Sequence, residues 1–361
     1  MSDLVAIYDS AERRALAHLP NRAIQAFGAV TFASVGYPFR VHDQRELWRY
    51  IDVMHEGRFE RNLALLKKVS DEELHLAAWL AKGTFDYSNA TFSRPFTGRH
   101  CLTRAIFQLR GIRQLNNERS GNKILELGPG SGYLSLLMAK TGYAVDTVEV
   151  AQALALHQSL FFGHFLPSES QVIHHQQGQQ PLTPTSRAGV RQVPWWIYAD
   201  DTQATLDYDL ITANHALAEF QPDSLSFLLR RFGKEHAERF GRSPIIIAES
   251  LGARMRPWED VIQQFHEHGW SHEADGSFYF FRFQPERARE QLQEDFEERR
   301  YQRSFVRSVK RATYLFVHER MKKNTPKKVA PVADSSIQTL RGIFDDLIPD
   351  EKTPDERYWS S

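Results

Sequence analysis

The sequence predicts an α/β protein in which a doubly wound sheet of seven strands follows a helical N-terminal region and precedes a helical C-terminal extension. Three observations indicate this fold. Short apolar runs alternate with helical stretches from Lys123 to Phe283, as in successive β-α-β units. A glycine-rich turn joins the first of these runs to a helix. The dipeptide Asp275-Gly276, a strong hairpin signal, separates the last two runs.

The composition excludes several classes of protein. Basic and acidic residues balance at 45 each in 361 residues, so no overall charge attracts nucleic acid or a membrane. The single cysteine, Cys101, excludes an intramolecular disulfide and a zinc site built from cysteine pairs. No stretch approaches the roughly 18–20 apolar residues that span a bilayer, and the N-terminus lacks the features of a signal peptide. We therefore expect a cytoplasmic protein without a transmembrane segment, and an oligomer is compatible with the sequence.

Residues 1–120 are predicted to be mostly helical and to act as a cap or lid on the sheet domain. Ser70 and Glu73 form a capping box, in which each side chain can bind a backbone N–H of the other residue. This signal opens a helix over Leu74–Leu80, and Gly83 is a natural end for it. A second helix is expected further along this region, over residues 102–115.

Between these helices, residues 85–100 are predicted to form a structured loop that can close over a ligand. The loop carries aromatic side chains for stacking on a sugar or adenine, and basic ones for a carboxylate or phosphate. These residues are Phe85, Tyr87, Phe92, Phe96, Arg94, Arg99 and His100. The alternative is a loop that packs on the sheet domain and leaves its arginines in water.

The predicted sheet domain covers residues 121–284. Its strands are expected at Lys123–Leu127, Ala144–Val150, Trp195–Ala199, Tyr208–Ala213, Pro244–Glu249, Trp270–Ala274 and Ser277–Phe283. A helix should begin near Pro257 and end at Gly269. Residues 167–194 are rich in Gln, His, Ser, Thr and Pro, which predicts a surface loop. In the extension, residues 285–361, helices are expected over 285–300 and 337–347.

The turn Glu126-Leu-Gly-Pro-Gly-Ser-Gly132 has the properties of a nucleotide-binding loop. Gly128, Gly130 and Gly132 allow positive φ and a close approach to a ligand, and the next helix offers free backbone N–H groups. Tyr133 stands where a dinucleotide fingerprint requires glycine.

Two acidic positions downstream sharpen this interpretation. Glu149 ends the next strand about 20 residues on, where an acid binds ribose hydroxyls. Asp200 and Asp201 follow the third predicted strand, from which a carboxylate can accept from an adenine amino group.

The glycine turn, with acids after strands two and three, resembles the pattern of class I S-adenosylmethionine-dependent methyltransferases over Lys123 to Phe283. The resemblance implies that the three glycines face the methionine and ribose parts of the cofactor. It places Glu126 near the methionine amino group, Glu149 at the ribose and Asp200 or Asp201 near adenine. The alternative is a nucleotide-binding or non-catalytic scaffold on the same sheet.

The fourth strand should bring Asn214 and His215 to the carboxyl edge of the sheet, where open α/β sheets bind ligands. Asn214 is therefore a candidate cofactor contact. His215 is a candidate general base for a hydroxyl acceptor, because its ordinary pKa lies near the working pH. Glu219 lies one helical turn away and can orient it. The alternative is that His215 only packs against the cofactor or caps the helix.

The residues after this strand exclude some acceptors. They lack the Pro-Pro stretch of amino-directed DNA methyltransferases, and no nucleophilic cysteine for cytosine chemistry lies nearby. The helical N-terminal region, glycine loop and strand-four Asn are similar to those of sugar O-methyltransferases of bacterial polysaccharide and natural-product pathways. This resemblance implies a sugar or other hydroxylated acceptor. A divalent metal is compatible with Asp201, Glu219, Asp223 and Glu249, but no spacing requires one.

Residues 299–328 form a basic stretch with eleven Lys or Arg residues and one acid, Glu319. Apolar residues recur in it at helical spacing, so a basic amphipathic helix can lie on an anionic membrane surface or hold a lipid-linked or other anionic substrate. It can instead dock nucleic acid or protein, which would favour a methyltransferase for those substrates. The alternative is a helix packed on the domain with its charges in water.

Overall fold

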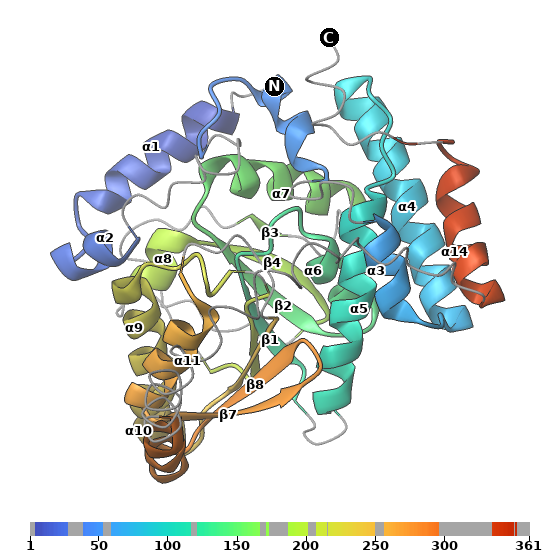
Figure 1. Cartoon of the computed structure of the whole chain (residues 1–361). Helices are drawn as coiled ribbons and strands as arrows, with labels where there is room; N and C mark the ends of the chain where they lie inside the picture. The colour runs from blue at the N-terminus through green and yellow to red at the C-terminus, as the bar shows by residue number, and fades with distance from the viewer. Residues whose placement is uncertain are drawn as a thin grey trace, which may run out of the picture.

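The computed structural model describes residues 4–27, 39–52, 59–116, 121–166, 171–172, 187–200, 207–214, 216–249, 256–295, 334–349 and 351. A twisted sheet lies between two layers of helices (Figure 1). Its strand order is β3-β4-β2-β1-β5-β6-β8-β7. Among the described strands, β8 alone runs against the others, since it pairs antiparallel with both β6 and β7.

The strands are β1 (Lys123–Leu127), β2 (Ala144–Glu149), β3 (Gln171–Val172), β4 (Gly189–Pro194), β5 (Leu210–Thr212), β6 (Ile245–Glu249), β7 (Trp270–Asp275) and β8 (Phe278–Phe283). The two-residue β3 adds an eighth strand at one edge. The other seven have the order and the reversed last hairpin of the class I methyltransferase sheet, which confirms the predicted fold class. In the hairpin, Asp275 pairs with Phe278, so the turn residues are Gly276, with φ of 60°, and Ser277.

Alternate residues of each strand face opposite helical layers, as in β1, where Ile124 and Leu125 enter different core clusters. One face carries η2 (Gln44–Tyr50), α3 (Phe59–Leu66), α4 (Asp71–Phe92), α5 (Arg99–Asn116), α6 (Tyr133–Lys140), α7 (Gln152–Phe165) and α14 (Ser335–Asp345). The other carries α2 (Asn21–Phe27), α8 (Trp195–Ala199), α9 (Pro222–Arg230), the π-helical turn η3 (Arg231–Glu235), α10 (His236–Phe240) and α11 (Trp258–Glu267). Helix α1 (Leu4–Leu16) packs against α7 and α8. No described helix is long and apolar enough to cross a membrane.

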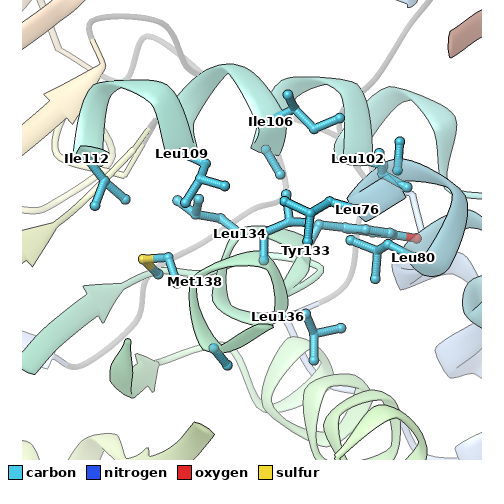
Figure 2. Packing of buried hydrophobic residues seen from close by; sticks show 14 of the residues in the cluster. Leu76, Leu80, Leu102, Ile106, Leu109, Ile112, Tyr133, Leu134, Leu136 and Met138 are labelled. Carbon is cyan, nitrogen blue, oxygen red and sulfur yellow. The ribbon is translucent and has the colours of Figure 1, made fainter. Parts of the chain in front are cut away.

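Helix α5 joins the N-terminal helices to the sheet. Leu102, Ile106 and Leu109 follow one another at helical spacing on α5 and are 0–1% exposed. Figure 2 shows this row over Leu134 and Met138 of α6. Truncating one such buried leucine to alanine costs about 2–5 kcal/mol of unfolding free energy. This contact therefore holds the N-terminal helices on α6, the helix that follows the glycine turn.

The C-terminal segment returns to the N-terminal helices, and Figure 1 shows α14 beside α4. Ser336 Oγ accepts a hydrogen bond of 2.9 Å from the Val69 N–H. Glu351, 3% exposed, accepts from the N–H and the hydroxyl of Thr97, both at 2.5 Å. Glu351 therefore ties the described part of the C-terminal segment to Thr97, just before α5.

The predicted end of the first long helix is wrong. The capping box of Ser70 and Glu73 is present, but α4 continues through Gly83 to Phe92. A Cβ at Gly83 would lie 2.2 Å from the ring of Phe165 on α7. The glycine is thus needed for close packing between two helices, and α4 instead ends at Ser93, whose φ is 53°. Residues 85–92, predicted as part of a loop, are consequently helical.

The predicted third strand is also wrong. Trp195–Ala199 forms the short helix α8, and the strand next to β2 is Gly189–Pro194, within the stretch expected to be a surface loop. The polar residues that suggested a loop have buried partners. Arg191 Nε donates to Asp146 Oδ1 at 2.7 Å, and Gln192 Nε2 donates to the Ala155 carbonyl at 2.7 Å.

Candidate functional site

The candidate site is built on the turn between β1 and α6. Gly128, Gly130 and Gly132 all have positive φ, at 64°, 58° and 86°. A Cβ at Gly132 would lie 2.6 Å from the Phe162 ring, and one at Gly128 would lie 3.0 Å from Ala216 Cβ. A Cβ at Gly130 would meet nothing within 4 Å. Two of the glycines are therefore required by packing, and the middle one borders open space in which a ligand can approach the backbone.

Helix α7 supports this turn. Gln158 Nε2 donates to the Gly130 carbonyl at 2.6 Å, and Phe162, one helical turn later, occupies the space beside Gly132. Sequence reasoning missed both residues. The available signal was Gln158 itself, a polar residue inside the apolar run of a helix, where a buried amide needs a hydrogen-bond partner.

Glu149 ends β2 beside the turn. It is 4% exposed and accepts a hydrogen bond of 2.9 Å from the Ala151 N–H. The backbone N–H groups of Gly130 and Val150 and the side-chain amide of Gln158 lie near this carboxyl group and lower its pKa. Burial outweighs them and raises the pKa of the Glu149 carboxyl to about 7. Glu149 therefore borders the glycine turn with capacity to accept hydrogen bonds from a ligand.

Glu126 lies in β1, two residues before the first glycine, and is 4% exposed. The Ser135 hydroxyl of α6 donates to it. Burial raises the pKa of Glu126 to about 7, and the nearby charge of Glu149 raises it further while Ser135 opposes both. Among the described residues, neither Glu126 nor Glu149 has a salt-bridge partner. The site therefore holds two buried acids without a cation.

Asn214 stands at the carboxyl end of β5. Its Nδ2 donates to Thr212 Oγ1 at 2.7 Å. Its Oδ1 is buried and has no hydrogen-bond partner among the described residues. Because Ala216 lies against Gly128, the segment after β5 is next to the glycine turn. The structure thus brings Asn214 to the same edge as Glu126 and Glu149, with one polar group open to a ligand.

The predicted catalytic pair is described only in part. His215 lies outside the described residues, so its role stays a prediction. Residues 216–220 form successive turns rather than the expected helix, with the Glu219 N–H bound to the Ala216 carbonyl at 2.9 Å. Glu219 is half-buried.

The predicted adenine acids do not follow a strand. Asp200 caps the end of α8, one short helix beyond β4, and its carbonyl accepts from Arg231 at 3.4 Å. Asp201 lies outside the described residues. All five residues of α8 are buried, so the helix separates Asp200 from the end of β4. The position that the sequence assigned to an adenine-binding acid is therefore displaced.

The three described residues named for a divalent metal, Glu219, Asp223 and Glu249, do not form a metal-binding group. The described part of the chain holds no group of three His, Cys, Asp or Glu side chains that could bind one. Glu249, 1% exposed at the end of β6, pairs with Arg104 and accepts from Gln108 Nε2 at 3.1 Å. Asp223 is exposed in the first turn of α9.

The start of α5 forms another wall of the site. A Cβ at Gly98 would collide with the Tyr133 hydroxyl, which donates to the Ile51 carbonyl at 2.8 Å. Cys101 Sγ lies 3.5 Å from the hydroxyl of Ser131 in the glycine turn. Although Cys101 comes well before the sheet in sequence, the structure puts its half-buried thiol beside the glycine turn.

The side chains of the predicted loop at residues 85–100 have partners within the protein. Tyr87 is buried and packs edge-on against Phe161, while Phe96 stacks on Trp48 at 6.2 Å. His100 Nδ1 lies 2.6 Å from Asp52, and the Arg99 guanidinium binds the Glu351 carbonyl. Burial lowers the pKa of His100 but Asp52 outweighs it, so the net shift is upward. Packing on the domain, the alternative interpretation, describes these contacts better than a lid.

The arrangement fits an adenosine-type cofactor. Open space at Gly130, an acid beside that turn, a second buried acid and the buried Oδ1 atom of Asn214 all lie at one edge of the sheet. The acids can bind hydroxyls or an ammonium group, and the N-terminus of α6 favours negative charge.

No protein-family pattern matches the sequence, and no curated protein does. Among solved structures, the chain resembles magnesium protoporphyrin IX methyltransferase from Synechocystis PCC 6803 with a TM-score of 0.35, 13% identity, and coverage of 59% of this chain and 98% of that one. It resembles a TehB-like methyltransferase from Corynebacterium glutamicum with a TM-score of 0.30, 16% identity, and coverage of 50% and 97%. A mutant of MtNAS in complex with S-adenosylmethionine gives a TM-score of 0.36, 12% identity, and coverage of 73% and 98%. These values are too low for the activity of any of them to be transferred to this chain.

Proposed function

We propose that the chain is an S-adenosylmethionine-dependent methyltransferase whose acceptor is a hydroxyl group on a sugar or another small molecule. One observation carries the cofactor assignment. The Glu149 carboxyl lies near the N–H of Gly130, where the space around the backbone is open. A ligand with a vicinal diol that enters this space meets an acid already placed to accept from its hydroxyls.

The residues at the edge have separable roles in this proposal. Glu149 holds the ribose, and Glu126, with the Oδ1 atom of Asn214, faces the ammonium group of the methionine part, which donates hydrogen bonds. Gln158 fixes the carbonyl of Gly130 and so keeps the turn in shape. When bound, S-adenosylmethionine supplies a methyl group on a sulfonium, an electrophile that needs an aligned nucleophile.

The acceptor assignment rests on the motif resemblance and on the chemistry of the segment after β5. A hydroxyl must lose its proton as its oxygen attacks, and His215 is the side chain that we propose to take it. Glu219 would orient that imidazole from the following turns. Replacing His215 with Asn should lower kcat by about a hundredfold or more while leaving cofactor affinity within about twofold.

A second candidate function uses the basic stretch at residues 299–328, which lies outside the described residues. If this stretch docks nucleic acid or protein, the acceptor is a macromolecule. Affinity for RNA or DNA that falls steeply with salt would favour that candidate. A folded protein that binds no cofactor would favour a non-catalytic scaffold.

The test is calorimetric titration with S-adenosylmethionine and S-adenosylhomocysteine. We expect micromolar binding that weakens about ten- to a hundredfold in Glu149→Gln, the effect of losing hydrogen bonds to a charged group. The matched control is Glu273→Gln, which removes an exposed acid from β7 beside Arg287. If folded wild-type protein binds neither compound, the proposed function is wrong.

A further inference from the structure

A small cavity lies where the N-terminal helix meets the sheet edge. It is bounded by α1, α7 and the ends of β2 and β4, and has a volume of about 40 Å³. Glu149 is at one side, Val193, Pro194 and Trp196 form apolar walls, and Tyr8 of α1 completes the lining. The cavity therefore continues from the carboxyl of Glu149 into an apolar pocket under α1.

The hydroxyl of Tyr8 is buried and has no hydrogen-bond partner among the residues that the structure describes. Burial raises the pKa of Tyr8, and the negative charges of Glu12 and Glu149 raise it further. The phenol is thus close enough to Glu149 to feel its charge, yet no hydrogen bond joins them. Burying a phenol without a partner is unfavourable, and a ligand with a suitable acceptor would remove that cost.

Helix α1 is held over the cavity by polar contacts along its length. Gln152, in the first turn of α7, donates to Asp9 at 2.7 Å, and Trp195 Nε1 donates to Glu12 at 2.8 Å. The Tyr8 ring packs edge-on against Trp196 at 5.2 Å. The position of Tyr8 is therefore fixed by the fold rather than by the cavity.

We infer that Tyr8 is a cofactor-binding residue and that its hydroxyl binds the ribose diol together with Glu149. A carboxylate only accepts hydrogen bonds, whereas a phenol can donate one. Two adjacent ribose hydroxyls supply a donor for Glu149 and an acceptor for Tyr8, and the apolar walls suit the attached purine. This inference rests on the proposed function, because it requires an adenosine-type ligand. It adds a contact from the N-terminal helix to the ribose, which the sequence had assigned to Glu149 alone.

The first experiment compares Tyr8→Phe with Tyr87→Phe, since both remove a buried hydroxyl without a partner. Calorimetry with S-adenosylhomocysteine should show about three- to tenfold weaker binding for Tyr8→Phe, the loss of one hydrogen bond, and no change for Tyr87→Phe. The melting temperature of free Tyr8→Phe should not fall, because the phenol has no bond to lose in the unliganded protein.

The second experiment locates the bond on the ribose. Wild type and Tyr8→Phe are titrated with the 2′-deoxy and 3′-deoxy forms of S-adenosylhomocysteine. With one of these ligands the difference between the two proteins should disappear, because the hydroxyl that Tyr8 binds is absent. Equal binding of S-adenosylhomocysteine by wild type and Tyr8→Phe, or a difference that persists with both deoxy ligands, overturns the inference alone. Failure of wild type to bind overturns the proposed function as well.

Discussion

Four buried acids in the sheet fall into two pairs with opposite surroundings. Asp146 on β2 and Glu249 on β6 each face an arginine, whereas Glu126 on β1 and Glu149 on β2 face none among the described residues. All four are 0–4% exposed. The four acids are therefore equally buried, but an arginine neutralises the charge of Asp146 and Glu249 and none neutralises that of Glu126 and Glu149 among the described residues.

The neutralised pair has the hydrogen bonds of structural ion pairs. Asp146 accepts from Arg191 and from the Tyr208 hydroxyl at 2.7 Å, and Glu249 accepts from Arg104 and Gln108. The other pair has neutral donors only, and burial raises the pKa of both carboxyls to about 7. This difference indicates which acids stabilise the fold and which are left for a ligand with donors or positive charge.

The largest expected effect is on the free energy of unfolding, which should respond differently to a substitution at each pair of acids. Arg104→Met should lower the free energy of unfolding by about 3–5 kcal/mol, because it leaves Glu249 charged and buried. Glu126→Gln should leave it unchanged or raise it, since the amide can still accept from Ser135 without a buried charge. Urea unfolding above neutral pH measures both. The comparison fails if Glu126→Gln is as destabilising as Arg104→Met.

The second prediction concerns pH. Carboxyls whose pKa is raised to about 7 in the folded protein favour folding when protonated, so this contribution to stability is lost as pH rises through about 7. The cofactor should prefer the ionised acids, so its affinity should rise about tenfold for each group between about pH 6 and about pH 8. Calorimetry in buffers of different ionisation enthalpy would also show proton release on binding. In Glu149→Gln the dependence should be shallower, and a flat profile in wild type would contradict the ligand role of these acids.

The smallest expected effect uses the single cysteine as a reporter. Because Cys101 Sγ lies 3.5 Å from Ser131 Oγ, a ligand at the glycine turn should shield the thiol. Saturating S-adenosylhomocysteine should slow its reaction with a maleimide several-fold. Mass spectrometry follows the reaction without ambiguity, since no other cysteine is present. Unchanged reactivity at saturation would place the ligand away from this wall of the site.

Local sequence patterns predicted the elements whose bounds do not depend on contacts with distant residues. The strand before the glycine turn, the strand that ends at Glu149 and the last hairpin lie within a residue of their expected bounds. Each has a short apolar run bounded by glycine or by a charged residue, a pattern that indicates a short strand. The glycine turn and Glu149 were predicted for the same reason, because special φ values and a strand-end acid are visible in the sequence.

Features that depend on contacts with residues distant in the sequence could not be predicted from local patterns. The aromatic residues of α8 favour a strand by propensity, yet they form a helix. Gly189–Pro194 is the strand that pairs with β2, and there Arg191 forms an ion pair with Asp146. Gly83 resembles a helix end and is instead a packing site for Phe165. Cys101 is some thirty residues from the glycine turn in the chain but beside it in space.

The sequence by itself determined the fold class, the positive-φ turn and the acid that ends β2, because these depend on residue types at fixed spacing. Only the tertiary structure decided which acids have an arginine, where α4 ends, and that α1 places Tyr8 next to Glu149. Those features depend on contacts between residues far apart in the chain. Their energies come from burial and pairing, which no local pattern contains.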